Sequence, residues 1–168
     1  MIAEQFIVRE AIPLDRSRIL DINRQTWQQC YQHIFDAEEM RGLFSNSLSQ
    51  YGSWVYRRDE RLSTFVAEVD GEIVGFIGMA SLLNPSLSEI TTFYILPAYH
   101  GQGIGKHLWQ SATQYLRDAG YTGVWVWALE RATQAMKFYQ AQNCQALAFG
   151  IYRIGEHKEQ AVGFWLDL

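Results

Sequence analysis

The sequence has little of what marks metal-binding or nucleic-acid-binding proteins. Its two cysteines, Cys30 and Cys144, form no CxxC and no metal-spaced pair, so each is expected to be a small buried apolar residue. The 14 Lys and Arg are outnumbered by 18 Asp and Glu, and the net charge of −4 argues against a nucleic-acid footprint or a basic membrane anchor. We therefore predict no metal, no nucleic acid and no membrane as partners.

The sequence also shows no pattern typical of a targeting segment or of a membrane-spanning segment. Residues 1–5 show no basic region followed by an apolar stretch, and no apolar run is long enough to cross a bilayer. No repeat, low-complexity tract or long linker interrupts the 168 residues, of which 48% are hydrophobic. A chain of this length can bury its own core. We expect a single domain over residues 1–168, located in the cytoplasm.

The spacing of apolar residues and turn residues predicts an alternation of strands and helices. Strands are predicted at residues 6–10, 64–69, 73–81, 89–95, 124–130, 146–154 and 161–168. Helices are predicted from about residue 15 to 34, 37 to 45, 104 to 119 and 131 to 143. Asp70-Gly71 between two apolar runs is typical of a two-residue hairpin turn. Asp15 or Ser17 is expected to cap the first helix.

The most informative segment is Pro97 to Lys106, which carries three glycines at alternate positions where a helix begins. Gly101, Gly103 and Gly105 leave the backbone open to a ligand and permit a left-handed conformation. The first N–H groups of a helix have no partner within it, and the helix dipole is positive at that end. The segment therefore predicts a phosphate or pyrophosphate site. Its spacing fits neither a Walker loop nor the dinucleotide-binding fingerprint of oxidoreductases.

The glycine segment resembles motif A of the GNAT superfamily of N-acetyltransferases, which reads Arg/Gln-x-x-Gly-x-Gly/Ala. His100, Gly103 and Gly105 occupy the motif positions, and they follow the hydrophobic-x-Pro-x-Tyr element at residues 95–99. His100 stands where the family usually has Arg or Gln. Because most of the motif's hydrogen bonds come from the backbone, this difference changes one side-chain contact.

A second resemblance lies about thirty residues further along the chain. The family has a strand followed by a helix with Asn-x-x-Ala-x-x-Phe-Tyr, and Ala135, Phe138 and Tyr139 fit this pattern. Ala132 stands in place of the Asn, and Asn143-Cys144 replaces the usual Gly-Phe after the helix. The two motifs together extend the resemblance over nearly the whole chain.

This resemblance implies the α/β (α+β) GNAT acyl-CoA N-acyltransferase fold. The fold is a mixed, mostly antiparallel seven-stranded sheet flanked by about four helices, in the order β-α-α-β-β-β-α-β-α-β-β. The implied activity is transfer of an acetyl group from acetyl-CoA to a primary amine by direct attack in a ternary complex. The acceptor is left open between a small-molecule amine and a peptide N-terminus, as is a homodimer. The alternative is a non-catalytic acetyl-CoA-binding sensor or interaction module.

The resemblance also assigns the cofactor contacts. The main chain of residues 93–95 would bind the pantetheine arm and polarise the thioester carbonyl, while residues 101–106 would hold the pyrophosphate. The expected contacts are Phe93, Tyr94, Ile95, His100, Gly101, Gln102, Gly103, Ile104, Gly105, Lys106 and Phe138. His100 is expected to contact phosphate or to cap the helix. Lys106 is expected to add a charged contact or to be solvated.

Two residues are candidates for proton transfer. Tyr139 is the candidate general acid, because a phenol with a reference pKa of ~10 holds its proton at neutral pH and can donate it to a thiolate. The alternative is packing beside Phe138. Glu89 is the candidate base. Since a carboxyl group with a reference pKa of ~4.3 is a weak base for an ammonium, it would act through water, with a raised pKa, or by attracting the amine. The alternative is an exposed charge at the end of a strand.

The remaining candidates are aromatic residues and histidines. Trp27 and Tyr31 are expected in the core or, in this fold, at the acceptor site, and Trp54 and Tyr56 have the same two interpretations. The four histidines are too scattered for a metal cluster, and three of them are expected on the surface: His33, His107 and His157.

Overall fold

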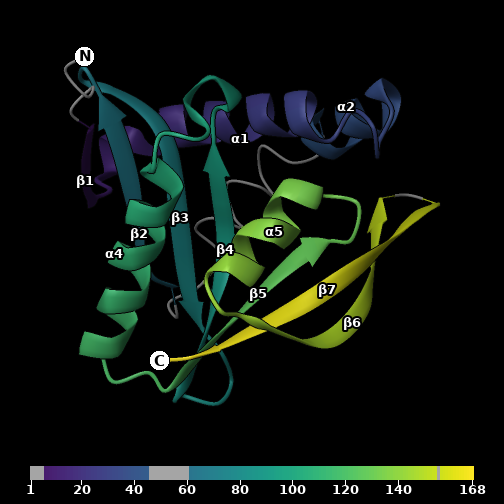
Figure 1. The fold of residues 1–168 in the computed structure, drawn as a ribbon. Coiled ribbons are helices and arrows are strands. Elements are labelled where there is room, and N and C mark those ends of the chain that lie inside the picture. The colour runs from purple at the N-terminus through teal and green to yellow at the C-terminus, as the bar shows by residue number, and fades with distance from the viewer. Residues whose placement is uncertain (1–5, 46–60, 155) are drawn as a thin grey trace.

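The computed structural model describes residues 6–45, 61–154 and 156–168, which form a twisted sheet with helices on both faces (Figure 1). The strands are β1 (Phe6–Glu10), β2 (Arg61–Val69), β3 (Glu72–Ser81), β4 (Leu87–Ile95), β5 (Gly123–Leu129), β6 (Gln145–Ile154) and β7 (His157–Asp167). The helices are α1 (Arg16–Cys30), α2 (Ala37–Ser45), α4 (Ile104–Asp118) and α5 (Thr133–Ala141), with 3-10 turns at Pro13–Asp15 and Pro97–Tyr99. This order confirms the predicted fold.

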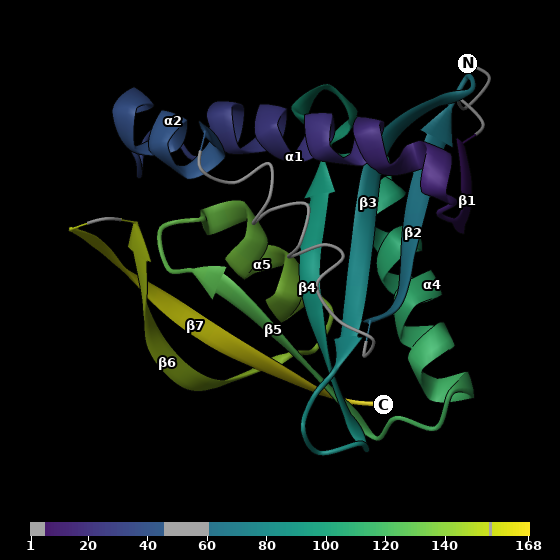
Figure 2. The ribbon, with the colours of Figure 1, turned by 180° about the vertical axis from the view of Figure 1, so that it is seen from behind.

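The seven strands lie in the order β1-β2-β3-β4-β5-β7-β6. Every neighbouring pair is antiparallel except β4 and β5, which are parallel. The β4–β5 pairing covers only Leu87–Ile90 against Gly123–Val126, and beyond it the two strands separate (Figure 2). The sheet is therefore split in its middle, and this split positions the site described below.

Strands β2 and β3 carry apolar side chains on both faces of the sheet. Helices therefore cover both faces and bury these side chains. Phe76 of β3 pairs with Val66 of β2, and both pack against Ile22 of α1. The next residue of β3, Ile77, points to the other face and joins the cluster that contains Leu108 of α4. Apolar groups at successive positions of residues 73–81 predict a central strand of this kind, and the structure confirms it.

Four residues with positive φ end or connect elements, and the sequence predicts three of them: the turn residues Asp70 and Gly71 and the helix stop at Gly120. Asp70 (φ +50°) and Gly71 (φ +81°) form the two-residue turn between β2 and β3, in which both central residues take positive φ. Gly120 (φ +88°) follows α4, as expected of a helix-terminating glycine. Asn143 (φ +62°) follows α5 at the position where the family usually has Gly, because Asn tolerates this conformation better than other residues with side chains.

Helix boundaries differ from the prediction at three places. Asp15 does not cap α1, because its carboxylate accepts hydrogen bonds from the Arg9 guanidinium at 2.7 Å and from Ile12 N at 2.8 Å. α1 ends at Cys30 rather than near residue 34, and α5 begins at Thr133 rather than residue 131. Across the ranges that the structure describes, no helix is both long enough and apolar enough to cross a membrane.

Candidate active site

The separation of β4 from β5 leaves one edge of β4 without a strand partner. Leu96 N donates to Val74 O of β3, and main-chain groups alternate in direction along a strand, so the main chain of Tyr94 also faces β3. The main-chain groups of Phe93 and Ile95 therefore face the gap. His100 Nε2 donates to Ile95 O at 2.7 Å, which leaves Phe93 to offer both its N–H and its C=O there.

A cavity of about 600 Å³ opens at this gap. Its described walls come from α1, β4, β5, α5, β6 and β7. Seven aromatic side chains line it: Trp27, Tyr31, Phe93, Tyr94, Trp127, Tyr139 and Tyr152. Among the described lining residues, Glu89 is the one acidic side chain, and none is Lys, Arg or His. The structure thus brings the predicted acid and base, Tyr139 and Glu89, and the predicted acceptor residues, Trp27 and Tyr31, to one cavity.

Tyr139 is held in a fixed position at the cavity wall. Its side chain is 5% exposed, and its ring packs against Trp109 at 5.6 Å and Phe164 at 5.5 Å between centroids. Burial raises the pKa of Tyr139, and the neighbouring Tyr94 raises it further. Within the described part of the chain, its hydroxyl has no hydrogen-bond partner. A phenol in this state keeps its proton and can direct it to a ligand in the cavity.

A second phenol reaches the same cavity from β4. Trp27 Nε1 donates to the Tyr94 hydroxyl at 3.2 Å, and the Trp27 and Tyr31 rings meet edge to face at 4.7 Å. Burial raises the pKa of Tyr94 and of Tyr31. Because the Tyr94 oxygen accepts from the indole, its own proton remains available as a donor. The sequence predicts Tyr94 as a main-chain contact, and its side chain is a site residue that the motif does not reveal.

Glu89 lies on β4 where that strand still pairs with both neighbours, opposite Ala80 of β3 and Trp125 of β5. It is half-buried and lines the cavity, so it is not the fully exposed strand-end charge of the alternative interpretation. Its assignment as the base stays a prediction. Trp54 and Tyr56, the other candidates for the acceptor site, lie outside the described residues.

Two aromatic residues of the cavity were not predicted. Tyr152 comes from β6, and Trp127 comes from β5 on the face opposite Val126. The Trp127 ring packs over glycines, since a Cβ at Gly163 would lie 3.0 Å from it and one at Gly150 would lie 3.3 Å from it. The alternation of tryptophan with valine at residues 124–127 was the available signal. Because side chains alternate along a strand, this pattern indicates that the valines face the core under α5 and that Trp127 points to the other face of the sheet.

The glycine segment places the start of α4 beside the open edge of β4. Gly101 (φ +75°) and Gly103 (φ +83°) take the left-handed conformation. The first main-chain bond of the helix runs from His107 N to Gly103 O at 3.2 Å, so the N–H groups of residues 104–106 precede it. A Cβ at Gly105 would lie 3.1 Å from Ile95, because helix and strand approach closely here. This geometry suits an anion at the start of α4, and the phosphate site stays a prediction.

Of the side chains predicted to contact the cofactor around this segment, some are exposed and others are bonded to or packed against the protein. His100 does not cap α4, because its ring bonds to Ile95 O and Gly103 is the N-cap residue. Lys106 and Gln102 are exposed. Phe138 packs edge to face against Phe93, with centroids 5.2 Å apart, on the core side of the segment. Contacts of these residues with a cofactor remain predictions.

Comparisons with known proteins agree with this geometry. The sequence model of the acetyltransferase (GNAT) family matches residues 18–143. The chain belongs to the GNAT family of acetyltransferases. An uncharacterized N-acetyltransferase of Archaeoglobus fulgidus is 29% identical over an alignment of 101 residues, and the alignment covers 57% of this chain and 68% of that protein. This GNAT chain is therefore an N-acetyltransferase, as the motifs predict.

Solved structures show the same fold. A GCN5-related N-acetyltransferase from Rhodopseudomonas palustris superposes with a TM-score of 0.78 at 19% identity, covering 100% of this chain and 99% of that one. The PaiA N-acetyltransferase of Thermoplasma acidophilum, in complex with coenzyme A, superposes with a TM-score of 0.74 at 16% identity, covering 98% and 99%. The seven-stranded sheet of the GNAT fold is thus confirmed for this chain.

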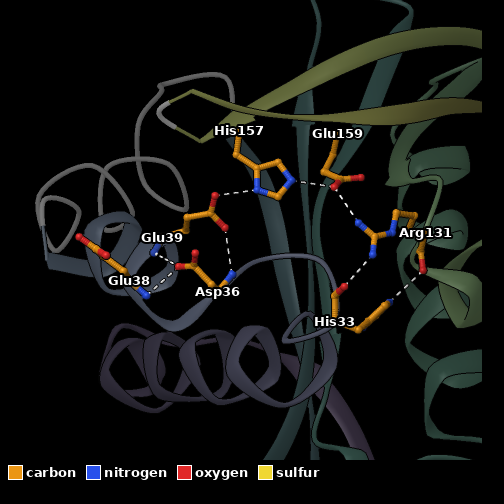
Figure 3. Close-up of polar contacts among 7 residues, drawn as sticks. All are labelled: His33, Asp36, Glu38, Glu39, Arg131, His157 and Glu159. Atoms are coloured by element: carbon orange, nitrogen blue, oxygen red, sulfur yellow. Dashed lines mark hydrogen bonds and ion pairs between the residues drawn. The ribbon is translucent and has the colours of Figure 1, made fainter.

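A polar network joins three segments of the acetyltransferase that are distant in the sequence (Figure 3). His157 of β7 bonds to Glu39 of α2 and to Glu159 of β7, each at 2.7 Å. Arg131, which precedes α5, reaches Glu159 at 3.0 Å and His33 O at 2.7 Å. The His157 ring also packs against Phe35, with centroids 4.9 Å apart. The network connects two parts of the chain to β7: helix α2 and the segment between α1 and α2.

His157 therefore corrects the expectation of a surface histidine. Both of its ring nitrogens face carboxylates, so both must carry hydrogen, and the imidazolium is the favoured form. Its hydrogen bonds to Glu159 and Glu39 raise the pKa of His157, and the pKa of Glu159 is lowered chiefly by the same contact. Asp36, which faces the network from the start of α2, accepts from the N–H groups of Glu38 and Glu39 at 2.9 and 2.8 Å.

Replacing His157 by Gln gives a destabilisation that depends on pH. Because the folded pKa of His157 is raised, its contribution is complete below about pH 6.5 and is lost as pH rises through the folded value. We expect the melting-temperature difference between wild type and His157→Gln to be larger at about pH 6 than at about pH 9. The control is His107→Gln, which removes an exposed histidine. A difference that is constant over this range would contradict the assignment.

Proposed function

We propose that this N-acetyltransferase moves an acetyl group from acetyl-CoA to a primary amine by direct attack in a ternary complex. One observation carries the proposal: the gap between β4 and β5 opens a cavity that has Tyr139 and Glu89 in its wall and an unpaired strand edge beside it. A thioester is already activated, so the protein's task is to align the reactants and move two protons. We treat residues 1–168 as one catalytic domain.

The cofactor side of the proposal rests on main-chain groups. The N–H groups at the start of α4 suit the pyrophosphate, because they point out of the helix at the positive end of its dipole. The gap-facing groups of Phe93 suit the amides of the pantetheine arm, which would lie beside β4 as a strand does. The solved neighbour with coenzyme A supports the choice of ligand. Lys106 and His100 lie close enough in sequence to add contacts.

The chemical steps use the two side chains of the cavity wall that are assigned to proton transfer, Glu89 and Tyr139. Glu89, directly or through water, takes a proton from the ammonium, and the freed nitrogen attacks the thioester carbonyl carbon. A main-chain N–H of β4 stabilises the oxyanion that forms. The intermediate collapses, the C–S bond breaks, and the Tyr139 hydroxyl gives its proton to the departing sulfur. The attacking nitrogen gives up its second proton, which returns through solvent to the Tyr139 phenolate and restores the phenol. The products are an acetamide and free coenzyme A.

The direct test is release of coenzyme A thiol from acetyl-CoA with a panel of amines, alongside a thermal-shift assay with coenzyme A. We expect coenzyme A to raise the melting temperature, because a ligand that binds the native state stabilises it. We also expect thiol release that requires an amine. Binding without release, for every amine in the panel, would favour a sensor or interaction module on the same fold.

Replacing Gly103 by Val tests the pyrophosphate site. Gly103 has φ +83°, which a β-branched residue cannot adopt without strain, so the loop must move and its N–H groups with it. We expect coenzyme A affinity to fall by at least about tenfold, measured by calorimetry, since losing one charge-assisted hydrogen bond costs about 1.5–3 kcal/mol.

The matched control is Gly120→Val at the opposite end of α4. Gly120 has φ +88° and no heavy atom within 4 Å of an added Cβ, so it imposes the same backbone strain far from the site. We expect Gly120→Val to lower stability and leave coenzyme A affinity unchanged. Equal affinities in Gly103→Val and wild type would remove the loop from the binding site.

A further inference from the structure

The walls of the cavity are aromatic to a degree that acetyl transfer alone does not require. The thioester end of the cofactor needs the β4 edge and Tyr139, whereas Trp127 and Tyr152 come from β5 and β6 on the far side of the gap. Trp127 is 44% exposed although it is the largest apolar side chain type, and its ring is seated on Gly150 and Gly163. A flat, open indole face supported from beneath is suited to stacking with a flat ligand.

The part of the wall that α1 provides is held rigid by contacts among aromatic residues, and these contacts reach Tyr152 of β6. Trp27 is fixed by its hydrogen bond to Tyr94, and its ring contacts those of Tyr31 at 4.7 Å and Tyr152 at 6.2 Å. Rigid aromatic side chains bind with little loss of conformational freedom. The cavity therefore offers a preformed wall that is rich in aromatic side chains, among them Trp27 and Trp127.

The charge of the wall is equally restricted. Glu89 is the single acidic side chain among the described residues of the cavity, and none of those residues is Lys, Arg or His. One carboxylate matches one ammonium. A carboxylate on the acceptor meets no cationic side chain in this set, and a second ammonium meets no further anion.

The positions of Glu89 and Trp127 on neighbouring strands relate the carboxylate to the aromatic wall. Glu89 is the register partner of Trp125, and Trp127 lies two residues further along β5, on the same face as Trp125. Two residues of a strand span roughly 6.6 Å. Glu89 and Trp127 therefore lie on neighbouring strands and on one face of the sheet, so one small acceptor can contact both side chains.

We propose that the acceptor is a monocationic aromatic amine, with its ammonium at Glu89 and its ring against Trp127. The inference rests on the proposed acetyl transfer and names the class of amine that this site takes. Trp127 acts as a specificity-determining residue, because it contacts the part of the acceptor that does not react.

The first experiment compares four amines with saturating acetyl-CoA. Phenethylamine has the ring and one charge, phenylalanine adds a carboxylate, spermidine has several charges and no ring, and ethylamine has neither ring nor extra charge. We expect kcat/KM for phenethylamine to exceed the others by at least about tenfold. Higher values for phenylalanine, spermidine or ethylamine would overturn the inference and leave acetyl transfer intact. Thiol release with none of the amines, despite coenzyme A binding, would instead count against the proposed function.

The second experiment changes the residue. We expect Trp127→Ala to raise KM for phenethylamine by about tenfold with kcat little changed, and to raise KM for ethylamine much less. Trp127→Phe keeps a ring and should recover part of the loss, which also guards against a folding defect. Phe149→Ala is the matched control, because Phe149 is 79% exposed and lies outside the cavity. An equal effect of Trp127→Ala on both amines would overturn the assignment.

Discussion

Tyr139→Phe is expected to lower kcat by ~10²–10⁴-fold, the range for loss of a general acid. The substitution keeps the ring, which packs against Trp109 and Phe164, and removes the hydroxyl that has no hydrogen-bond partner in the described structure. Folding and coenzyme A affinity should therefore hardly change. Steady-state kinetics with acetyl-CoA and an amine that the wild type accepts, together with calorimetry for coenzyme A, measure the two quantities.

The control for this prediction is Tyr121→Phe, which makes the same chemical change at a half-buried tyrosine away from the cavity. Near-normal turnover in Tyr139→Phe would return Tyr139 to a packing role. Tyr94→Phe would then be the informative variant, because the Tyr94 hydroxyl also reaches the cavity and has its own proton to donate.

Glu89→Gln is expected to reduce kcat at neutral pH by ~10²–10⁴-fold if the carboxylate is the base. The amide keeps the shape of the side chain and loses its basicity. Because a primary amine has a pKa of ~10, the fraction of free amine rises about tenfold with each pH unit below that value. The rate of Glu89→Gln should therefore recover in part toward high pH. Rate profiles from about pH 6 to 10 measure this.

The same variant distinguishes two roles of Glu89. If Glu89 only attracts the ammonium, KM rises and kcat is largely kept. Glu72→Gln is the control, since Glu72 is exposed at the hairpin and does not line the cavity. Wild-type kinetics at every pH would show that another group or solvent takes the proton.

The parts of the fold that follow from local signals were predictable. Asp70-Gly71 predicts its hairpin because the turn needs positive φ at two adjacent residues, and few other residue pairs adopt that conformation readily. The glycine segment likewise identifies itself, since Gly101 and Gly103 stand where positive φ is required. In both cases a few neighbouring residues contain the whole physical cause.

The parts that depend on distant segments were not predictable in this way. His157 is 118 residues from Glu39, and only the fold brings the two together. Trp127 alternates with valines as any strand residue does. That its face lines a cavity depends on where β4 leaves β5, and hydrophobic periodicity contains no information about that point. Asp15 failed as a cap for a more local reason, because Arg9, six residues earlier, competes for its carboxylate.

The unpaired edge of β4 has one more consequence, for association with other chains. A free sheet edge is normally a template on which a foreign strand can add. This edge lies inside the sheet, with α1 packed on β4 from one face and α5 packed on β5 from the other. An incoming polypeptide strand carries side chains on both faces and needs room above and below the sheet. The cysteamine and β-alanine part of a pantetheine arm has no branches and would need less room, so the interior position of the edge would favour such a ligand over a polypeptide strand.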